Sequence, residues 1–296
     1  MQSKQPTSGE SEFKIIRNIA ELRGKLFELD EATKISDDAL RAAFKTFAMD
    51  FSYDVPDNPH AIEYRNKQFE IYELIAGKSY GVKNEGTQID GVNSASRPFP
   101  YYTESYETVG NHLISIGFLI KTMGLAPKSR VLEFGPGWGN TTEAMARMGY
   151  EVTAVDIEQN FIDLINERAK RNQVSIETIC DDFAHIENVQ EPFDAILFFE
   201  CFHHCSDHLR LIRAFERAVK PGGKIIFGAE PITDAFPLPW GLRLDGESLW
   251  AIRNFGWLEL GFQEKYFRET LEKYGWKLAK HVCPETPWGT VFVATR

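Results

Sequence analysis

Several features that define other classes of protein are missing from this chain of 296 residues. It contains only 4 cysteines, too few for a disulfide scaffold at this length, so reduced thiols in a cytosolic compartment are expected. No stretch approaches the ~20 apolar residues that span a bilayer, and no charged-then-apolar signal sequence opens the chain. These absences predict a cytoplasmic protein without a membrane span.

An excess of positive charge is also missing, because the formal net charge is −10 at pH 7. Nucleic acids and anionic membranes both favour a basic face, so neither is expected as the main partner. Hydrophobic residues make up 43% of the chain and include 22 phenylalanines, which is ample for a packed core. The length then predicts one large domain or two small ones.

Residues 1–125 are expected to form a helical region that covers a cofactor. Five apolar residues recur there at alternating steps of four and three: Ile15, Ile19, Leu22, Leu26 and Leu29. This spacing predicts an apolar stripe along one helix. The stripe could form a homodimer contact, but two heptads are few for a coiled coil and favour packing on the helix's own domain.

From residue 129 short apolar runs alternate with helical stretches. Strands are expected at 130–134, 151–155, 175–179, 194–199 and 224–227, and helices at 141–148, 161–172 and 208–219. Repeated strand–helix–strand units predict a parallel sheet with helices on both faces. A helix at 263–274 and strands at 277–282 and 290–295 follow, the last two as an antiparallel hairpin. The expected fold is therefore α/β: a Rossmann-like, doubly wound, mostly parallel sheet over residues 126–296.

The strongest motif reads VLEFGPGWGNTT over residues 131–142, a strand that runs into a glycine-rich turn and then a helix. Gly135 and Gly137 allow a sharp turn and let a ligand approach the backbone. Asn140 or Thr141 could cap the helix, whose N-terminal dipole would face that ligand. The motif therefore predicts a nucleotide-type cofactor at this turn.

Two details of the motif favour S-adenosylmethionine over NAD. The third glycine, Gly139, falls one place earlier than in the dinucleotide pattern, and Glu133 precedes the loop. A carboxylate there can meet the cofactor's ammonium group directly or through water. Asp156 lies 19 residues after Gly137, next to Ile157 at the tip of the next strand, where such folds bind ribose hydroxyls.

Residues 126–230 resemble class I S-adenosylmethionine-dependent methyltransferases, as the segments FDAILFFE at 193–200 and VKPGGK at 219–224 also do. The resemblance implies that Asp182 and Phe183 recognise the adenine, with Asp181 as the neighbouring alternative. It implies that Glu200, at the end of the fourth strand, faces the cofactor. S-adenosyl-L-homocysteine would be the product of the cofactor.

Two histidines follow the fourth strand in ECFHHCSD, and Glu230 follows the fifth. Ligands of doubly wound sheets bind beyond the carboxyl ends of the strands, so these side chains should line one crevice. An alcohol acceptor must lose a proton, and a histidine suits that task near neutral pH. We therefore expect His203 or His204 as general base, with Glu230 orienting the base or a sugar hydroxyl.

A metal is not predicted from these residues. The spacing of the cysteines and histidines at 201–205 matches no common structural zinc pattern. A divalent ion held by Glu230 and a histidine stays an open alternative.

Residues 231–262 are too long for an ordinary connection and mix Trp and Phe with charged residues, which predicts a lid or substrate wall. Aromatic faces with carboxylates and guanidiniums suit a sugar, and they also suit an aromatic acceptor. The expected substrate contacts are Trp240, Arg243, Asp245 and Trp250. Upstream, the segment RPFPYYT at 97–103 could close over the cofactor through Tyr101 and Tyr102.

The segments PWGLRLDGESLWAIR and RPFPYYTES look like methyltransferases of bacterial glycan assembly. This resemblance implies O-methylation of a sugar hydroxyl in polysaccharide biosynthesis. The alternatives are an O-methyltransferase of an aromatic or other small natural product, a non-catalytic cofactor-binding protein, and an NAD-dependent oxidoreductase. A tight apolar pocket without carboxylates from residues 231–262 would favour the aromatic acceptor.

Overall fold

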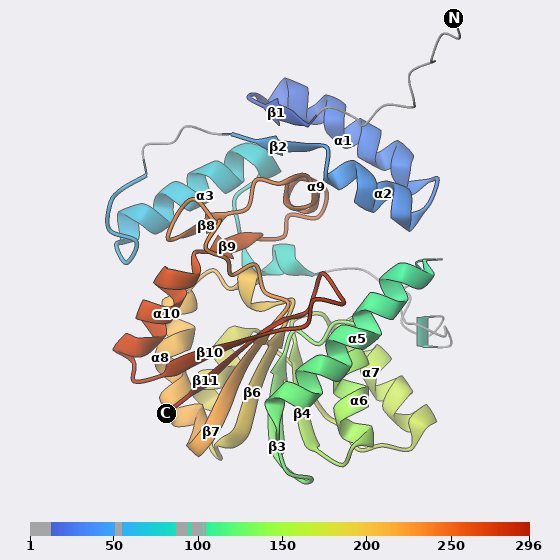
Figure 1. The fold of residues 1–296 in the computed structure, drawn as a ribbon, viewed down its shortest axis with the longest axis vertical. Coiled ribbons are helices and arrows are strands. Elements are labelled where there is room, and N and C mark those ends of the chain that lie inside the picture. The colour runs from blue at the N-terminus through green and yellow to red at the C-terminus, as the bar shows by residue number, and fades with distance from the viewer. Residues whose placement is uncertain (1–12, 51–54, 87–93, 96–102, 104) are drawn as a thin grey trace, which may run out of the picture.

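A computed structural model describes residues 13–50, 55–86, 94–95, 103 and 105–296 of the chain. Figure 1 shows a large sheet flanked by helices and, across one end of it, a second layer of smaller elements. The N-terminal elements and the insertion at 231–262 build this second layer together. Segments far apart in the sequence are therefore neighbours at the end of the sheet.

The main sheet has seven strands in the order β10-β11-β7-β6-β3-β4-β5 among the described residues. Their bounds are β3 Arg130–Phe134, β4 Glu151–Asp156, β5 Glu177–Cys180, β6 Phe193–Phe199, β7 Val219–Gly228, β10 Lys277–Val282 and β11 Thr290–Thr295. The strands from β5 to β7 pair in parallel, whereas β11 pairs antiparallel with both β7 and β10. The predicted mostly parallel sheet with an antiparallel C-terminal hairpin is confirmed.

Helices cover both faces of this sheet (Figure 1). One face carries α5 (Tyr106–Met123), α6 (Asn140–Arg147) and α7 (Gln159–Asn172), and the other carries α8 (His208–Ala218) and α10 (Glu264–Lys273). Successive strand residues point to opposite faces. In β6, Leu197 packs in the cluster under α5, whereas Ile196 and Phe198 pack in the larger cluster on the other face. The continuous apolar run of β6 follows from burial on both sides.

The N-terminal region contains α1 (Ile19–Thr33), α2 (Asp37–Phe44), α3 (Ile62–Ala76) and the 3₁₀ turn η1 (Val82–Glu85). It also contains two short parallel strands that the sequence did not predict, β1 (Lys14–Ile16) and β2 (Phe47–Met49). The first helix begins only at Ile19, because the side chain of Asn18 caps it by accepting the backbone N–H of Glu21. Ile15 therefore lies in a strand and not in the expected helical stripe.

The rest of the predicted stripe packs inside the chain. Leu22, Leu26 and Leu29 are at most 6% exposed and belong to the main hydrophobic cluster. A side chain buried in its own domain offers no surface to a second copy. These residues of the stripe therefore pack in the core of their own chain and do not form the homodimer contact that we considered.

The insertion contains β8 (Trp240–Leu242), α9 (Gly246–Asn254) and β9 (Leu260–Phe262), with β8 and β9 antiparallel. Buried hydrogen bonds fix it to α3. The Tyr64 hydroxyl donates to the Trp240 carbonyl at 2.6 Å, and the Tyr72 hydroxyl donates to the Gly256 carbonyl at 2.5 Å. Because such buried bonds are costly to leave unmade, the insertion forms a fixed wall over the strand ends and not a free flap.

Among the described helices, none is both long and apolar enough to cross a membrane.

Candidate active site

A cavity of about 880 Å³ lies where the carboxyl ends of β3, β4, β6 and β7 meet the second layer. From the strand side it is lined by residues that follow those strands, among them Gly135, Gly137, Asp156, Glu200, His203, His204 and Glu230. From the second layer it is lined by Arg41, Tyr80, Glu85, Arg243, Glu247, Trp257 and Glu259. The cavity therefore coincides with the ligand position that a doubly wound sheet predicts.

The glycine-rich loop leaves β3 at Phe134 and forms one wall of this cavity. Gly135 has φ +57°, and a Cβ there would lie 2.6 Å from Cβ of Cys201, so only glycine fits the turn. Gly137 has φ +50° and open space where its Cβ would point. Its N–H donates to Oδ2 of Asp156 at 3.0 Å. The loop thus offers bare backbone to a ligand at the point where β3 and β4 end.

The start of α6 differs from the prediction. The N-cap residue is Gly139, with φ +73°, rather than Asn140 or Thr141, and no described side chain caps the helix. Asn140 is already engaged, because its side-chain oxygen accepts a hydrogen bond from Arg168 at 2.9 Å. The glycine is required there by close packing, since a Cβ would lie 2.6 Å from Ile165.

Asp156 ends β4 and is 6% exposed. Its two carboxylate oxygens accept the backbone N–H groups of Glu158 and Gly137 at 2.9 and 3.0 Å. Burial raises the pKa of Asp156 to about 6, although these hydrogen bonds oppose the rise. A carboxylate has about four acceptor positions, so this one can still accept hydroxyl groups from the cavity, where Ile157 lies beside it.

Glu133 lies beneath the loop and not on the cavity wall. It is 1% exposed, and its Oε2 accepts the hydroxyl of Thr142 at 2.6 Å, which ties β3 to α6. Burial raises the pKa of Glu133 to about 7. Of the two expected ways for Glu133 to meet an ammonium group in the cavity, directly or through water, this burial leaves only the one through water.

The residues after β5 line the cavity next to Asp156. Asp182 caps the 3₁₀ turn η2 (Phe183–Asn188) by accepting the N–H of Ala184 at 2.6 Å. The Phe183 ring packs on Phe134 with ring centres 5.6 Å apart. Asp181 lies 3.1 Å from Nδ1 of His185. Both acidic candidates for the adenine end thus reach the cavity.

Glu200 follows β6 with φ +52°, a backbone conformation that residues other than glycine rarely adopt. Such conformations often mark a functional site. Its Oε2 lies 3.2 Å from Nε2 of His112 on α5. The His112 ring meets Trp288 edge to face, with ring centres 5.4 Å apart. His112 and Trp288 line the cavity but come from segments without a recognisable motif, so sequence reasoning missed them.

The acceptor end of the cavity is organised by Glu230, which follows β7 and is 5% exposed. Its carboxylate accepts the backbone N–H groups of Cys201, Phe202 and His203 at 2.8, 2.8 and 3.1 Å. It also lies 2.7 Å from Nδ1 of His203. Four contacts from one carboxylate fix the turn η3 (Phe202–His204) and the imidazole together.

This geometry decides which nitrogen of His203 faces outward. Burial alone would raise the pKa of Glu230, but the charge and hydrogen bond of His203 and the N–H groups of Phe202 and Cys201 outweigh it, so the pKa is lowered. An ionised Glu230 can only accept, so the proton of a neutral His203 is on Nδ1 and the lone pair is on Nε2. The structure brings these two predicted residues together in a base-orienting arrangement.

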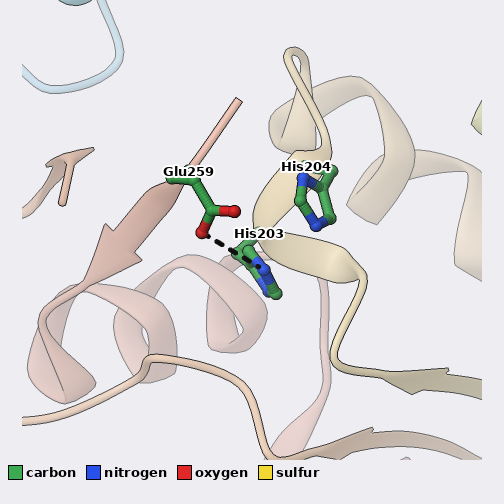
Figure 2. A group of neighbouring side chains, drawn as sticks. All are labelled: His203, His204 and Glu259. Carbon is green, nitrogen blue, oxygen red and sulfur yellow. Dashed lines mark ion pairs between the residues drawn. The ribbon is translucent and has the colours of Figure 1, made fainter. Parts of the chain in front are cut away.

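Two glutamates that sequence reasoning missed complete this end of the site. Nε2 of His203 lies 3.7 Å from Oε2 of Glu259, which precedes β9, and Figure 2 shows both residues with His204. Oε2 of Glu259 also lies 3.3 Å from Arg243, and Glu85 of η1 lies 3.3 Å from Nδ1 of His204. Both glutamates are distant in sequence from the HH pair, so no local pattern points to them.

The pKa of His204 reflects this carboxylate-rich setting. Burial would lower the pKa, but the neighbouring Glu85 carboxylate outweighs it, with smaller contributions from Glu259 and Glu230. The pKa of His204 is raised to about 9, so this imidazole holds its proton at neutral pH. His204 is therefore the poorer of the two predicted proton acceptors.

Of the four predicted substrate contacts, only Arg243 lines the cavity. Trp240 is 3% exposed because it packs on Tyr64, and its Nε1 donates to the Pro59 carbonyl at 2.8 Å. Asp245 caps α9 by accepting the N–H of Ser248 at 3.1 Å.

Trp250 also points away from the cavity. Its ring packs on Phe44 of α2, and its Nε1 lies 3.3 Å from Asp30 of α1. The predictions for Trp240, Asp245 and Trp250 are thus wrong, because the two indoles join the insertion to the N-terminal layer and the Asp245 side chain caps α9. Tyr101 and Tyr102 lie outside the described residues.

The insertion lines the cavity with Glu247, Trp257 and Glu259 instead. Nε1 of Trp257 is buried and makes no hydrogen bond with any described residue. A buried N–H without a partner is costly, which makes this indole a candidate donor to a ligand. Trp257 precedes β9 in a stretch whose side chains could not be oriented from sequence alone.

Among the described residues, the cysteines of the 201–205 cluster do not form a ligand group with the histidines. Cys201 and Cys205 are buried, and the Cys201 thiol donates to the Phe134 carbonyl at 2.9 Å. Burial raises the pKa of Cys205 to about 12. A zinc site made of these two thiols and the two imidazoles is therefore not formed.

Comparison with known proteins agrees with this geometry. Residues 132–227 match the family described as "Methyltransferase domain". A segment of 97 residues is 35% identical to the ubiquinone biosynthesis O-methyltransferase of Coxiella burnetii, and covers 33% of this chain and 42% of that protein. The corresponding protein of Xanthomonas campestris is 33% identical over 100 residues, again 33% of this chain and 42% of that protein.

Among solved structures, a protein of Nostoc punctiforme provisionally named an O-methyltransferase superposes with a TM-score of 0.51 and 17% identity. The superposition covers 78% of this chain and 68% of that chain, and it shows a shared fold. The family match shows a methyltransferase domain over residues 132–227, in agreement with the resemblance to class I S-adenosylmethionine-dependent methyltransferases found in the sequence. The chain spans less than half the length of the curated relatives that it matches.

Proposed function

We propose that the whole chain is an S-adenosylmethionine-dependent O-methyltransferase whose acceptor is a sugar hydroxyl of a bacterial glycan or glycan precursor. One observation carries the proposal. The insertion presents Arg243, Glu247 and Glu259 to the same cavity that holds the paired His203 and Glu230. A charged wall beside an oriented imidazole suits an acceptor rich in hydroxyl groups.

The residues at the other end of the cavity fit the cofactor. The bare backbone of Gly135 and Gly137 offers the close approach that a bulky ligand needs, and the Asp156 carboxylate reaches the wall to accept ribose hydroxyls. Asp182 and Phe183 lie beyond Asp156 for the adenine. When bound, S-adenosylmethionine supplies an activated methyl group on its sulfonium.

The protein's own chemical task is to position the acceptor and move its proton. The lone pair on Nε2 of His203 takes the hydroxyl proton as the oxygen attacks the methyl group. Glu230 keeps the ring oriented and stabilises the resulting imidazolium. The remaining catalysis comes from holding the two reactants in line.

The second layer completes the acceptor site. Arg41 of α2 lies 3.8 Å from Glu247 of α9, and the Glu85 carboxylate accepts the N–H of Leu258 at 3.0 Å. We therefore assign the described part of residues 1–125 as a cover over the active site. The carboxylates of the insertion meet the condition that favours a sugar over an aromatic acceptor.

The first experiment is calorimetric binding of S-adenosylhomocysteine to the full chain, with NAD as the competing ligand. We expect micromolar binding of S-adenosylhomocysteine and none of NAD. Incubation with radiolabelled methyl donor and a panel of free and lipid-linked oligosaccharides then tests the acceptor. Binding without transfer to any acceptor would support a non-catalytic protein, and binding of NAD alone would refute the cofactor.

A phenolic acceptor is the second candidate, since the curated relatives are named for ubiquinone biosynthesis. Trp257 and Trp288 also offer aromatic surface to the cavity. The same transfer assay includes a polyprenylated catechol. Faster methylation of the catechol than of every saccharide would replace the sugar proposal by this one.

A further inference from the structure

We propose that His203, His204 and Glu259 bind a divalent first-row transition-metal ion such as Zn²⁺ at the acceptor end of the cavity. The inference rests on the proposed function for what the ion would do. The binding site itself rests on the side chains alone. The sequence predicted no metal, because Glu259 lies far along the chain from the two histidines.

The three side chains bring one ligand atom each into a small group that an ion could draw together on binding. One nitrogen from each imidazole and one carboxylate oxygen lie within 4.8 Å of one another, and Nε2 of His203 is 3.7 Å from Oε2 of Glu259. Zinc binds nitrogen and carboxylate oxygen at about 2.0–2.2 Å, which places its ligands about 3–4 Å apart. Figure 2 shows the histidines on η3 and Glu259 just before β9.

Each ligand is also supported from its far side. Glu230 lies 2.7 Å from Nδ1 of His203, which is the carboxylate–histidine arrangement that orients metal-binding imidazoles. Arg243 lies 3.3 Å from Oε2 of Glu259 and restrains that carboxylate. Nδ1 of His204 lies 3.3 Å from Oε2 of Glu85, and a bound ion would displace the proton that this imidazole otherwise holds.

The charge around the cluster favours a bound cation. Three carboxylates, Glu85, Glu230 and Glu259, surround the two imidazoles. Among the described residues, Arg243 is the permanent cation within ion-pair distance of this group, and it also pairs with Asp245 at 3.0 Å. A divalent ion would balance the excess negative charge inside a site with little solvent.

Two nitrogens and one carboxylate oxygen suit Zn²⁺ and similar borderline ions better than Mg²⁺, which prefers oxygen ligands. Three protein ligands leave a coordination position open toward the cavity, as catalytic zinc sites do. Glu230 is excluded as a ligand because four hydrogen bonds, two on each oxygen, already fill its acceptor positions. The site therefore differs from the Glu230-centred alternative considered from the sequence.

Within the proposed function, the ion would change how the acceptor hydroxyl loses its proton. When bound, the ion would supply a positive charge that lowers the pKa of the acceptor hydroxyl, and the proton of that hydroxyl would pass to water. Nε2 of His203 is then a ligand and no longer accepts the proton. The cofactor site and the acceptor class are unchanged.

The test is calorimetric titration of the full chain, freed of any affinity tag, with Zn²⁺ and in parallel with Mn²⁺, after treatment with chelator. We expect one ion per chain, with affinity reduced more than about 100-fold in Glu259→Gln and in His204→Ala. The controls are His281→Ala and Glu191→Gln, which alter an exposed histidine and an exposed glutamate elsewhere. Binding of S-adenosylhomocysteine by each variant reports that its fold and cofactor site persist.

No ion bound by the wild type, or equal affinity in Glu259→Gln and the wild type, overturns the metal site. If S-adenosylhomocysteine still binds in that case, the proposed function stands with His203 as the proton acceptor. If the ion binds but S-adenosylhomocysteine does not, the metal site stands and the proposed function fails. The two proposals are therefore separately refutable.

Discussion

Oε2 of Glu230 lies 2.7 Å from Nδ1 of His203, although the two residues follow different strands of the sheet. The contact exists because β6 and β7 are neighbours and end at the same edge. Glu230 also accepts three backbone N–H groups of the η3 turn, so it cannot move without releasing the imidazole. A pair this constrained gives the active site its most direct test.

Replacing the carboxylate by Glu230→Gln should reduce the rate constant of methyl transfer by about 100-fold or more, because the imidazole loses its orienting acceptor. Binding of S-adenosylhomocysteine should change little, since the hydrogen bonds of Glu230 go to Cys201 and the η3 turn and not to the glycine loop. Single-turnover transfer and calorimetry measure the two effects. Glu216→Gln, an exposed change on α8, is the control, and equal loss of cofactor binding in Glu230→Gln would indicate a merely structural role.

Asp156→Asn should weaken S-adenosylhomocysteine binding by at least about 10-fold, because the amide accepts fewer hydroxyl hydrogen bonds. Burial raises the pKa of Asp156 to about 6, so wild-type binding should weaken as the pH falls through 6 while the carboxylate becomes protonated. The variant should lack this pH dependence. Calorimetry from pH 5 to 8, with the exposed change Asp163→Asn as reference, decides the matter. A pH profile that is the same in both variants contradicts the assigned ribose contact.

Glu133 should make the stability of the apoprotein depend on pH. The pKa of Glu133 is about 7 in the folded protein, above its ordinary value of 4.5 in the unfolded chain. The contribution of Glu133 to the free energy of unfolding is therefore fully present below about pH 4.5 and is lost as the pH rises through 7. That difference corresponds to at most about 3 kcal/mol. Urea unfolding should show Glu133→Gln gaining stability over the wild type at pH 8 but not at pH 4.5. The matched exposed variant Glu151→Gln should follow the wild type.

Trp257→Phe removes the buried indole N–H but keeps an aromatic ring. A lost hydrogen bond of about 0.5–1.5 kcal/mol should raise the acceptor KM about 2- to 10-fold with little change in kcat. Steady-state kinetics on the acceptor identified in the transfer assay measure this. An unchanged KM, with kcat reduced, would show that Trp257 shapes the site without touching the acceptor.

Leu22→Ala tests the place of the N-terminal helix. The side chain is 1% exposed within its own chain, so its truncation should cost about 2–5 kcal/mol of unfolding free energy. The molar mass in light scattering should equal that of the wild type. A variant of unchanged stability but smaller molar mass would mean that the stripe joins two copies after all.

The sheet was predictable because its signals are local. The strands at 130–134, 277–282 and 290–295 match the prediction in full, since each is bounded by turn residues. The cofactor loop was predictable for the same reason, because only glycine allows its positive φ values next to Cys201. The two short strands β1 and β2 were missed, because three-residue strands leave no periodic pattern.

The insertion shows where sequence reasoning stops. Its composition predicted a substrate wall, but not which of its aromatic and charged side chains face the cavity. Trp240 and Trp250 turn toward α3 and toward α1 and α2, where they are needed to join the two parts of the second layer. Trp257 and Glu259 face the cavity instead. Orientation of this kind depends on neighbours that are far away in the chain.

The sequence by itself therefore determined the fold class, the glycine loop and the positions of Asp156, His203 and Glu230 at the strand ends, because periodicity and backbone constraints act over a few residues. Only the tertiary structure decided that Glu133 is covered, that Glu230 orients His203, and that Glu85 and Glu259 surround the two histidines. Those contacts join residues from β3, η1, η3 and the insertion. Their distances are fixed by the packing of the second layer on the sheet, which no local pattern records.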